Sequence, residues 1–451
     1  MRTIRLHDTR TGAVRGLETR EPGRVGIYAC GPTVYGRIHV GNARPYVVFS
    51  LLKRFLAHEG YGVRFVANIT DINDKIYAAA DSEGIGSAQL AREMAAAYRA
   101  DTDRLGLGRP DAEPLASQSI PGIIGLIDRL IERGHAYPAD GDVYFSVRSY
   151  PEYGKLSHRN VDDMDQGEGL EGGARKRDPL DFALWKAEKP GEDTAWDAPW
   201  GRGRPGWHIE CSAMAEQLLG LDFEIHGGGS DLVFPHHENE AAQTAAARGR
   251  PLARLWVHNG MVRMDREKMA KSVGNIHLLG QALDRYGRDP LIMLFCSGHY
   301  RQPIEFDAER LAEAQARVDR IREAGRRLAP APSPDWSGPL KERFFAALGE
   351  DFNTPGALAV VFEWVREANR AESGTGGEDL REMLEVLALE NLLDSGQEAE
   401  APAAVRALAG ERESARERRD FAAADHLRDE LRAAGWEVRD GPAGPELRPV
   451  G

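Results

Sequence analysis

Apolar and polar positions in the first part of the chain change from one spacing to another, and the change predicts a strand, a helix and a second strand. Residues 24–30 (RVGIYAC) form a short β-rich run that ends at a Gly-Pro turn. In residues 45–58 (PYVVFSLLKRFLAH) the apolar side chains recur every three or four positions, as in a helix with one buried face. Residues 63–70 (VRFVANIT) form another apolar run after a glycine-containing turn. This order predicts a βαβ unit and a parallel sheet.

The rest of the chain divides into an insertion, a return of strands and a helical C-terminal part. Residues 160–206 are rich in glycine, proline and charge, which predicts an insertion with mobile loops. Strand-like runs return at 221–226 (LDFEIH) and 255–262 (LWVHNGMV), as expected for the second half of the same sheet. From about residue 276 onward the spacing is helical, interrupted by APAPSPDWSGP at 329–339 and GQEAEAPA at 396–403. We therefore predict a split α/β domain followed by helices.

Composition narrows the class of protein without indicating an activity. The chain has 451 residues, of which 29% are charged and 42% apolar, as in ordinary globular proteins. Its formal net charge of −13 argues against a protein that coats nucleic acid without preference, although one defined RNA could meet a local basic groove. Three cysteines are too few for a disulfide framework and suit a reducing cytoplasm. We find neither a signal-peptide core nor an apolar run of membrane-spanning length.

Two short motifs carry candidate metal ligands. WHIEC ends at Cys211, and FPHHENE ends at Glu240. If the proline of the second motif opens a helix, His236 lies four residues and His237 three residues before Glu240, so spacing alone does not choose between the histidines. Two cysteines, a histidine and a carboxylate are ligand types that zinc accepts. Because Cys30 is far from Cys211 in sequence, two unrelated buried thiols remain the alternative.

Two further motifs suit phosphate binding. HVGN at 39–42 lies where the predicted helix follows its strand, and helix N-termini offer free N–H groups to phosphate. KMAKSVGN at 268–275 places two lysines three residues apart in a glycine-containing segment, which suits a loop that holds polyphosphate. A solvated basic turn is the alternative for the second motif taken alone.

The same motifs, in their order, resemble the cysteinyl-tRNA synthetase family of class I aminoacyl-tRNA synthetases. HVGN is similar to the HIGH element of class I enzymes, and KMAKS is similar to their KMSKS loop. The resemblance continues through these blocks: CGPTVYGRIHVGNAR, NITDINDK, DFALWK, GWHIECSAM, HGGGSDLVFPHHENE, DFNTPGALAVVFEWVREAN and RRDFAAADHLRDELRAAGWEVRD. It covers essentially the whole chain. The chain departs from the family's usual motifs in three places. Asn73 stands in place of Asp in the NITDINDK block, Ala270 stands in place of the middle serine of KMSKS, and the C-terminal tail lacks a tryptophan.

The resemblance implies a split Rossmann-type parallel-sheet catalytic domain with an insertion, followed by C-terminal helical domains. The expected divisions are the first half of the catalytic domain at 1–120, a connective-peptide-like insertion at 121–205, the second half with the metal site and loop at 206–275, a stem-contact-like helical region at 276–328, a helical bundle at 340–395 and a small anticodon-binding-like domain at 404–451.

The resemblance also implies the roles of single residues. The implied zinc ligands are Cys30, Cys211, His236 and Glu240, with His237 left out. The implied catalytic residues are His39, Asn42, Lys268 and Lys271. The implied ATP site adds Thr33, Gly41, Gly229, Asp231 and Ser272 to these four. The implied cysteine pocket contains Gly31, Thr70, Trp207 and His226.

The expected activity is the two-step joining of L-cysteine to tRNA(Cys), with ATP and Mg²⁺ for activation and one Zn²⁺ per chain to select the thiolate. The expected protein is a cytoplasmic monomer without a membrane partner. Two alternatives share the motifs: the related ligase that joins cysteine to an amino sugar in mycothiol biosynthesis, and a catalytically silent paralogue. The helical region after residue 340, and the retained motif residues, favour the synthetase. Cys296 lies in an apolar run and is expected to be a packing residue.

Overall fold

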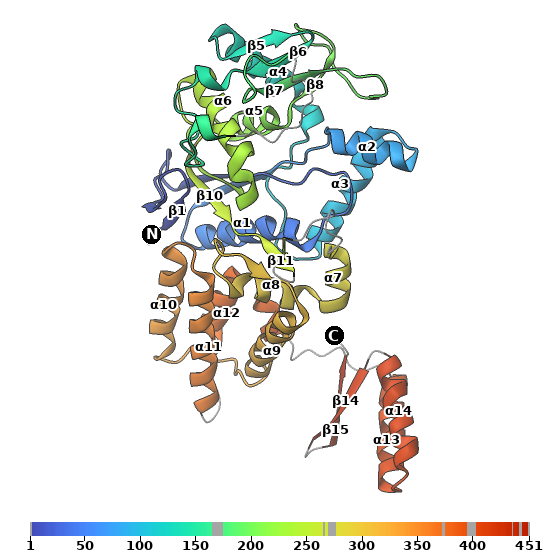
Figure 1. Cartoon of the computed structure of the whole chain (residues 1–451). Coiled ribbons are helices and arrows are strands. Elements are labelled where there is room, and N and C mark those ends of the chain that lie inside the picture. Colours follow the sequence, from blue (N-terminus) through green and yellow to red (C-terminus); the bar gives the residue numbers. More distant parts are fainter. Residues whose placement is uncertain are drawn as a thin grey trace.

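A four-stranded parallel sheet organises the first 264 residues (Figure 1). The computed structural model describes residues 2–164, 175–264, 267–268, 277–371, 375–394, 403–434, 436–441 and 444–449. The strands of the sheet, in spatial order, are β10 (Ala253–Asn259), β9 (Phe223–Gly229), β3 (Arg24–Ala29) and β4 (Gly62–Ala67). Every neighbouring pair in it is parallel. The predicted βαβ unit is therefore present, and the later strand-like runs do complete the same sheet.

Helix α1 (Val40–His58) begins five residues earlier than the apolar spacing predicts. Its N-cap is His39, whose ring nitrogen Nδ1 accepts a hydrogen bond from the Asn42 N–H at 3.3 Å. The Asn42 side chain accepts in return from the His39 N–H at 3.3 Å, which completes a capping box. The predicted start rested on the apolar spacing of residues 45–58. The capping pair instead adds a full turn ahead of Pro45, which lies inside the helix.

The two faces of the sheet are covered by different helices because side chains alternate along each strand. In β3, Ile27 packs into a core with α1, whereas Tyr28 packs into a second core with α5 (Trp207–Leu219) and α6 (Glu238–Arg248). Gly227 in β9 is required by this packing, since a Cβ there would lie 2.0 Å from the Phe49 ring. The sheet is thus buried on both faces, and its edge carries the polar groups.

The chain between β4 and β9 holds four α-helices and a separate antiparallel sheet among its described residues. The helices are α2 (Asp74–Glu83), α3 (Ser87–Asp103), α4 (Ile120–Glu132) and α5, already described. The sheet has the order β5 (Ala136–Ala139), β6 (Asp142–Phe145), β7 (Phe182–Ala187) and β8 (Gly203–Pro205). The last two strands lie within the segment whose composition predicts only loops. Cross-strand pairing and the burial of Trp185 stabilise these two strands, and composition alone predicts neither of them.

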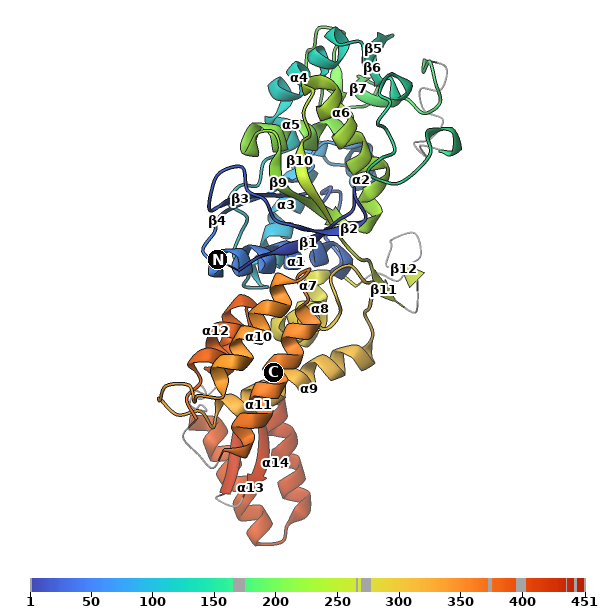
Figure 2. The same ribbon diagram turned by 90° about the vertical axis from the view of Figure 1, so that its left-hand side faces the viewer.

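The C-terminal part is helical, as its pattern predicts, but ends in a hairpin. Helices α7 (Leu279–Tyr286), α8 (Arg288–Ser297), α9 (Ala308–Gly325), α10 (Ser337–Gly349), α11 (Thr354–Arg370) and α12 (Glu378–Val386) lie below the parallel sheet in Figures 1 and 2. The last unit comprises α13 (Ala403–Glu417), α14 (Phe421–Ala433), β14 (Trp436–Gly441) and β15 (Gly444–Pro449). It has an apolar cluster of its own around Leu431 and Trp436.

Short strands complete the described chain. A hairpin of β1 (Arg5–Asp8) and β2 (Ala13–Gly16) lies at the N-terminus, and β11 (Val262–Met264) pairs with β12 (Glu267–Lys268) and β13 (Ile304–Glu305). Among the helices of the described residues, none is long and apolar enough to cross a membrane.

Arg44 ties helix α1 to the segment that follows β10. The side chain is fully buried, and its Nη1 donates to the carbonyl oxygens of Gly260 at 2.6 Å and Met261 at 3.0 Å. Burial lowers the pKa of the guanidinium to about 10. A buried cation that is held by carbonyl oxygens stabilises the fold only while those hydrogen bonds persist.

We expect Arg44→Met to lower the free energy of unfolding by about 2–3 kcal/mol, because it removes the hydrogen bonds that a buried charged group donates to the Gly260 and Met261 carbonyl oxygens. Urea unfolding followed by tryptophan fluorescence measures the change. Arg64→Met is the matched control, since Arg64 is exposed in β4, and a change within about 0.5 kcal/mol is expected there. Equal losses in the two variants would contradict the role assigned to Arg44.

Candidate metal centre and nucleotide cleft

The four sequence-predicted zinc ligands lie at the carboxyl edge of the parallel sheet and in the helices behind it. Cys30 directly follows β3, and Cys211 lies in α5. Glu240 lies in the first turn of α6, which begins at Glu238. Phe234 is extended, with φ −139° and ψ 133°, and it is the one residue of the preceding turn Val233–His237 without helical angles, so the helical backbone opens at the proline of the motif, as predicted. His236 therefore lies in the helical turn Val233–His237 that precedes α6.

These four side chains converge, and we call them the predicted donor set: Cys30, Cys211, His236 and Glu240. One ligand atom from each lies within 4.8 Å of every other. The Cys30 Sγ atom is 3.5 Å from His236 Nε2 and 3.3 Å from Glu240 Oε1, and His236 Nε2 is 3.1 Å from the same carboxylate oxygen. All four residues are buried. Unrelated buried thiols, the alternative that the sequence left open, do not describe this geometry.

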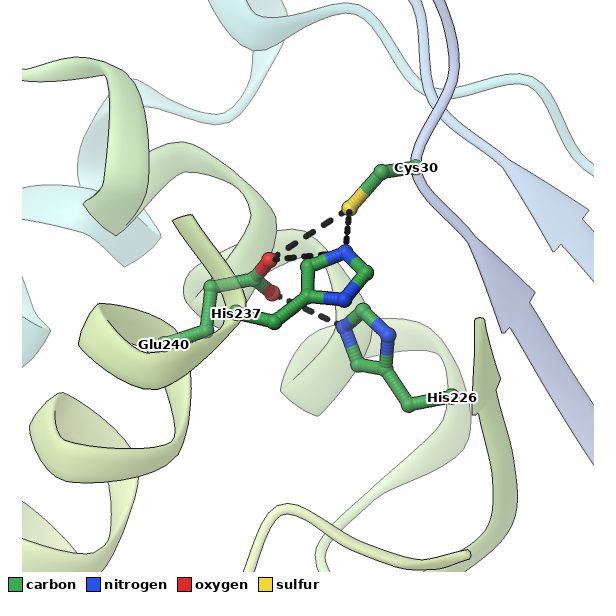
Figure 3. Close-up of side chains that lie close together, drawn as sticks. All are labelled: Cys30, His226, His237 and Glu240. Atoms are coloured by element: carbon green, nitrogen blue, oxygen red, sulfur yellow. Dashed lines mark hydrogen bonds and ion pairs between the residues drawn. The ribbon is translucent and has the colours of Figure 1, made fainter. Parts of the chain in front are cut away.

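A second group of four donors shares two residues with the first. It consists of Cys30, His226, His237 and Glu240, also with ligand atoms within 4.8 Å of one another, and we call it the alternate donor set (Figure 3). His237 Nε2 lies 3.3 Å from Cys30 Sγ, and His226 Nε2 lies 2.9 Å from Glu240 Oε2. The ambiguity between His236 and His237 in the sequence is thus retained in the structure.

Hydrogen bonds to further histidines orient the histidines of both donor sets. His236 shares a hydrogen bond of 2.9 Å with His208, and His237 shares one of 2.7 Å with His258, which in turn is 2.7 Å from the Thr9 hydroxyl. Burial lowers the pKa of His236 and of His258 to about 3 in each case. Neutral imidazole is the form that ligates metals, so the burial prepares these rings for that use.

The net pKa shifts of the thiols and of the carboxylate have opposite directions. Burial raises the pKa of Cys30, with Cys211 beside it adding to the shift, and burial likewise raises the pKa of Cys211. For Glu240, burial raises the pKa, but His226 and His236 outweigh it and the net shift is downward. A divalent cation would reverse the cost for the thiols by coordinating them as thiolates. Sulfur, imidazole and carboxylate donors in this arrangement fit a zinc ion.

A cleft of about 500 Å³ opens beside the metal centre. Its lining includes Cys30 and these residues predicted for the ATP and cysteine sites: Gly31, Thr33, His39, Gly41, Asn42, Trp207, Gly229 and Asp231. The Trp207 ring stacks on His236 with their centroids 4.2 Å apart, so the cleft reaches the metal centre at this ring. The N-terminus of α1 lies in the same cleft, with its cap residues in the lining.

Two predicted cysteine-site residues lie behind the lining. Thr70 is buried and pairs with Thr33 in an isolated bridge between their segments. His226 is buried and faces Glu240 rather than the cleft. These two positions could act on a ligand only through the residues in front of them.

Asn68 is a site residue that the motifs did not single out. Its side-chain oxygen accepts from the Gly31 N–H at 3.0 Å, and its Nδ2 donates to the Thr70 hydroxyl at 3.2 Å. The approach is so close that a Cβ on Gly31 would lie 1.8 Å from the Asn68 carbonyl oxygen. Asn68 begins the NITDINDK block, but nothing in its spacing marks it, because its partner Gly31 is 37 residues away in sequence.

The KMAKS segment is only partly described. Lys268 is the last residue of β12, and its backbone pairs with that of Arg263 in β11. The other residues of interest in this segment lie outside the described residues: Ala270, Lys271 and Ser272. Asn73, the other departure from the family wording, is the N-cap of α2 and accepts from the Lys75 N–H at 3.1 Å. Asn and Asp cap helices equally well, which accounts for the replacement.

Cys296 lies apart from both donor sets. It is buried among apolar side chains of α8 and its neighbours, and burial raises the pKa of its thiol to about 12. The packing role predicted for it agrees with this position.

Two family models match the chain. The model described as tRNA synthetases class I (C) catalytic domain matches residues 17–316, and the model described as DALR domain matches residues 343–394. Curated relatives match over almost the full length. The chain is 47% identical to the cysteine–tRNA ligase of Alkalilimnicola ehrlichii, over 99% of each chain, and 44% identical to that of Pseudothermotoga lettingae, over 98% of each.

Solved structures with low sequence identity share the fold. The Mycobacterium tuberculosis methionyl-tRNA synthetase in complex with methionyl-adenylate aligns with a TM-score of 0.60 at 16% identity, covering 82% of this chain and 91% of that one. The AgnB2 LeuRS of Agrobacterium radiobacter K84, in a ternary complex with tRNA and LeuAMS, aligns with a TM-score of 0.62 at 11% identity, covering 84% and 85%.

The buried histidines predict a pH dependence of stability. In the unfolded chain a histidine protonates below about pH 6.5, whereas His258 stays neutral in the fold down to about pH 3, so acidification favours unfolding across that interval. We expect His258→Asn to reduce the slope of unfolding free energy against pH by about 1.4 kcal/mol per unit between pH 6 and pH 4.5, in urea titrations of the metal-free protein.

The control is His426→Asn, because that side chain is 76% exposed and meets water in both states. Its slope should equal that of the unsubstituted protein. If His258→Asn leaves the slope unchanged as well, His258 is not the buried neutral group described above.

Proposed function

The chain belongs to the cysteine–tRNA ligases, a family of class I aminoacyl-tRNA synthetases, and on that premise we propose that it activates L-cysteine with ATP, selects the amino acid through zinc and transfers it to tRNA(Cys). The catalytic-domain model covers most of the chain, and the named relatives span its full length. The relatives' names supply the substrate class, and the residues around the cleft supply the proposed roles.

One observation carries the finer part of this proposal: Cys30 of the predicted donor set and the N-terminus of α1 line a single cleft. Cys30 and Trp207 lie in its lining on the metal side, and His39 and Asn42 lie in it at the start of α1. An amino acid whose side chain faces the donors can therefore present its carboxylate to a nucleotide at the helix. Proximity of this kind is the main requirement for adenylate formation.

The start of α1 is suited to hold the ATP phosphates. Backbone N–H groups and the positive end of the helix dipole would attract phosphate there, and Gly41 keeps the approach open. In the first step the cysteine carboxylate attacks the α-phosphate and pyrophosphate leaves. His39 and Asn42 would orient the phosphates, and Lys268 and Lys271, with Mg²⁺ bound to ATP, would offset their charge. No side chain needs to form a covalent intermediate.

Discrimination between cysteine and serine is the most difficult requirement of the proposed reaction. The two differ by one atom, and a pocket that reads only shape separates such substrates by about 10–200-fold. The residues that would hold zinc are the predicted donor set, and zinc, when bound, would favour a thiolate over a hydroxyl. Trp207 stacks on His236 and would close the pocket against larger side chains. Asn68 would keep Gly31 and Thr70 in place around the amino acid.

In the second step the 3′-terminal adenosine hydroxyl of the tRNA attacks the adenylate carbonyl. The C-terminal helices are the proposed contact for the rest of the tRNA, with α13, α14 and the β14–β15 hairpin as the most distant part in Figure 1. A monomer in the cytoplasm is the proposed state.

We expect cysteine-dependent exchange of labelled pyrophosphate into ATP, with serine less active by more than the ~200-fold that a shape-only pocket allows. Cys211→Ala should lower the cysteine-dependent exchange by about tenfold or more, because one sulfur donor of the site is lost. Cys296→Ala, a matched change at a buried cysteine remote from the cleft, should leave the exchange within about twofold. Absence of exchange by the intact, zinc-loaded protein would point to a catalytically silent paralogue.

Deletion of residues 404–451 should separate activation from charging. Because this unit has its own apolar cluster, its removal leaves the cleft and the sheet intact. We expect tRNA charging to fall by about tenfold or more, the equivalent of about 1.4 kcal/mol of lost RNA contact, while pyrophosphate exchange persists. Loss of exchange together with charging, in a truncated protein with native circular dichroism, would contradict this division of labour.

A further inference from the structure

We propose that the metal centre has two overlapping positions for its ion, one in the predicted donor set and one in the alternate donor set of Cys30, His226, His237 and Glu240. Cys30 and Glu240 belong to both sets, and the ion would exchange Cys211 and His236 for the other two histidines. This inference concerns metal binding alone, so it does not depend on which amino acid the protein activates.

The separations in the alternate donor set match a tetrahedral site. Zinc bonds of about 2.0–2.3 Å place neighbouring ligand atoms about 3.3–3.8 Å apart. Cys30 Sγ lies 3.3 Å from His237 Nε2 and 3.3 Å from Glu240 Oε1, and His237 Nε2 lies 3.8 Å from the same oxygen. His226 Nε2 lies 2.9 Å from Glu240 Oε2, in a hydrogen bond that an ion would replace, and the ligand atoms of the set all lie within 4.8 Å of one another. Figure 3 shows Cys30, His237 and one carboxylate oxygen of Glu240 linked to one another, and His226 facing the other carboxylate oxygen.

Neighbouring groups hold His237 of the alternate donor set in a ligating orientation. His237 uses its Nδ1 to pair with His258, and the Thr9 hydroxyl holds His258 in turn, so Nε2 faces Cys30. A partner on the far nitrogen fixes both the orientation and the protonation of a metal-binding imidazole. His236 has the same kind of support from His208. The fold therefore prepares both histidines alike and does not exclude either from the ion.

The charge of each set gives a reason for the second position. With zinc, the two thiolates and one carboxylate of the predicted donor set sum to a net charge of −1. The alternate donor set has one thiolate and one carboxylate and is neutral with the ion. Since every member of both sets is buried, a neutral cluster costs less to keep away from water. The predicted donor set compensates with a second sulfur, which zinc favours.

The test replaces the residues unique to each set and measures cobalt binding to the full chain after removal of its metal. Cys211→Ala/His236→Asn removes the predicted donor set and leaves the alternate one. His226→Asn/His237→Asn does the reverse. We expect each double variant to bind about one cobalt ion. The Cys211→Ala/His236→Asn variant should show a weaker thiolate-to-cobalt charge-transfer band than the His226→Asn/His237→Asn variant, because it coordinates one thiolate rather than two.

The triple variant Cys211→Ala/His236→Asn/His237→Asn should bind cobalt about a hundredfold more weakly than the Cys211→Ala/His236→Asn variant.

Cobalt binding should be compared with near-ultraviolet circular dichroism and with ATP binding, which report whether each variant is folded. A folded Cys211→Ala/His236→Asn variant that binds no cobalt overturns the proposal. If that variant does not fold, Cys211→Ala is compared with Cys211→Ala/His237→Asn: a drop of about a hundredfold supports the alternate set, and equal affinities overturn it. The control Cys296→Ala should keep the full charge-transfer band. Failure of cysteine-dependent exchange in the unsubstituted protein would contradict the proposed function and leave these binding results unaffected.

Discussion

The burial of many polar donors at one edge of a sheet is the constraint on which the rest of this structure depends. Two thiols, a carboxylate and several imidazoles lie out of contact with water. Isolated polar groups are costly to bury, so each must find a partner. Among the described residues, the partners are other histidines, the hydroxyl of Thr9 in the turn after β1, and the Glu240 carboxylate that both donor sets share. The donors are consequently held in place before any ion arrives.

The parallel sheet makes this arrangement possible. Its strands are buried on both faces, and their carboxyl ends place Cys30 beside the glycine-rich end of β9. Glycines at that end allow close packing, because a Cβ on Gly228 would lie 3.0 Å from the His237 ring. Helix α1 then starts from the segment that follows Cys30, which brings a helix N-terminus and a metal centre into one cleft. Neither element could be moved without the other.

Periodicity predicted the parts of the fold in which local pattern and tertiary packing agree. The βαβ unit and the C-terminal helices follow from apolar spacing, because those faces are the ones that become buried. The early start of α1 was missed, since it depends on a capping pair rather than on apolar residues, and β8 was missed because it is stabilised by pairing with β7. The donor residues could be listed from their chemistry, but Asn68 could not, because its two partners are defined only by the folded chain.

The capping box of α1 has a consequence for how a ligand would enter. The side chains of His39 and Asn42 each accept a hydrogen bond from the backbone N–H of the other residue. The imidazole of His39 therefore occupies the acceptor position at the helix start that an anion could otherwise take. An arriving phosphate would take over the Asn42 N–H and set the imidazole free, exchanging one acceptor for another of higher charge. The empty and filled forms would then have the same number of satisfied donors at this turn. Such an exchange needs a rotation of one side chain and no movement of the backbone.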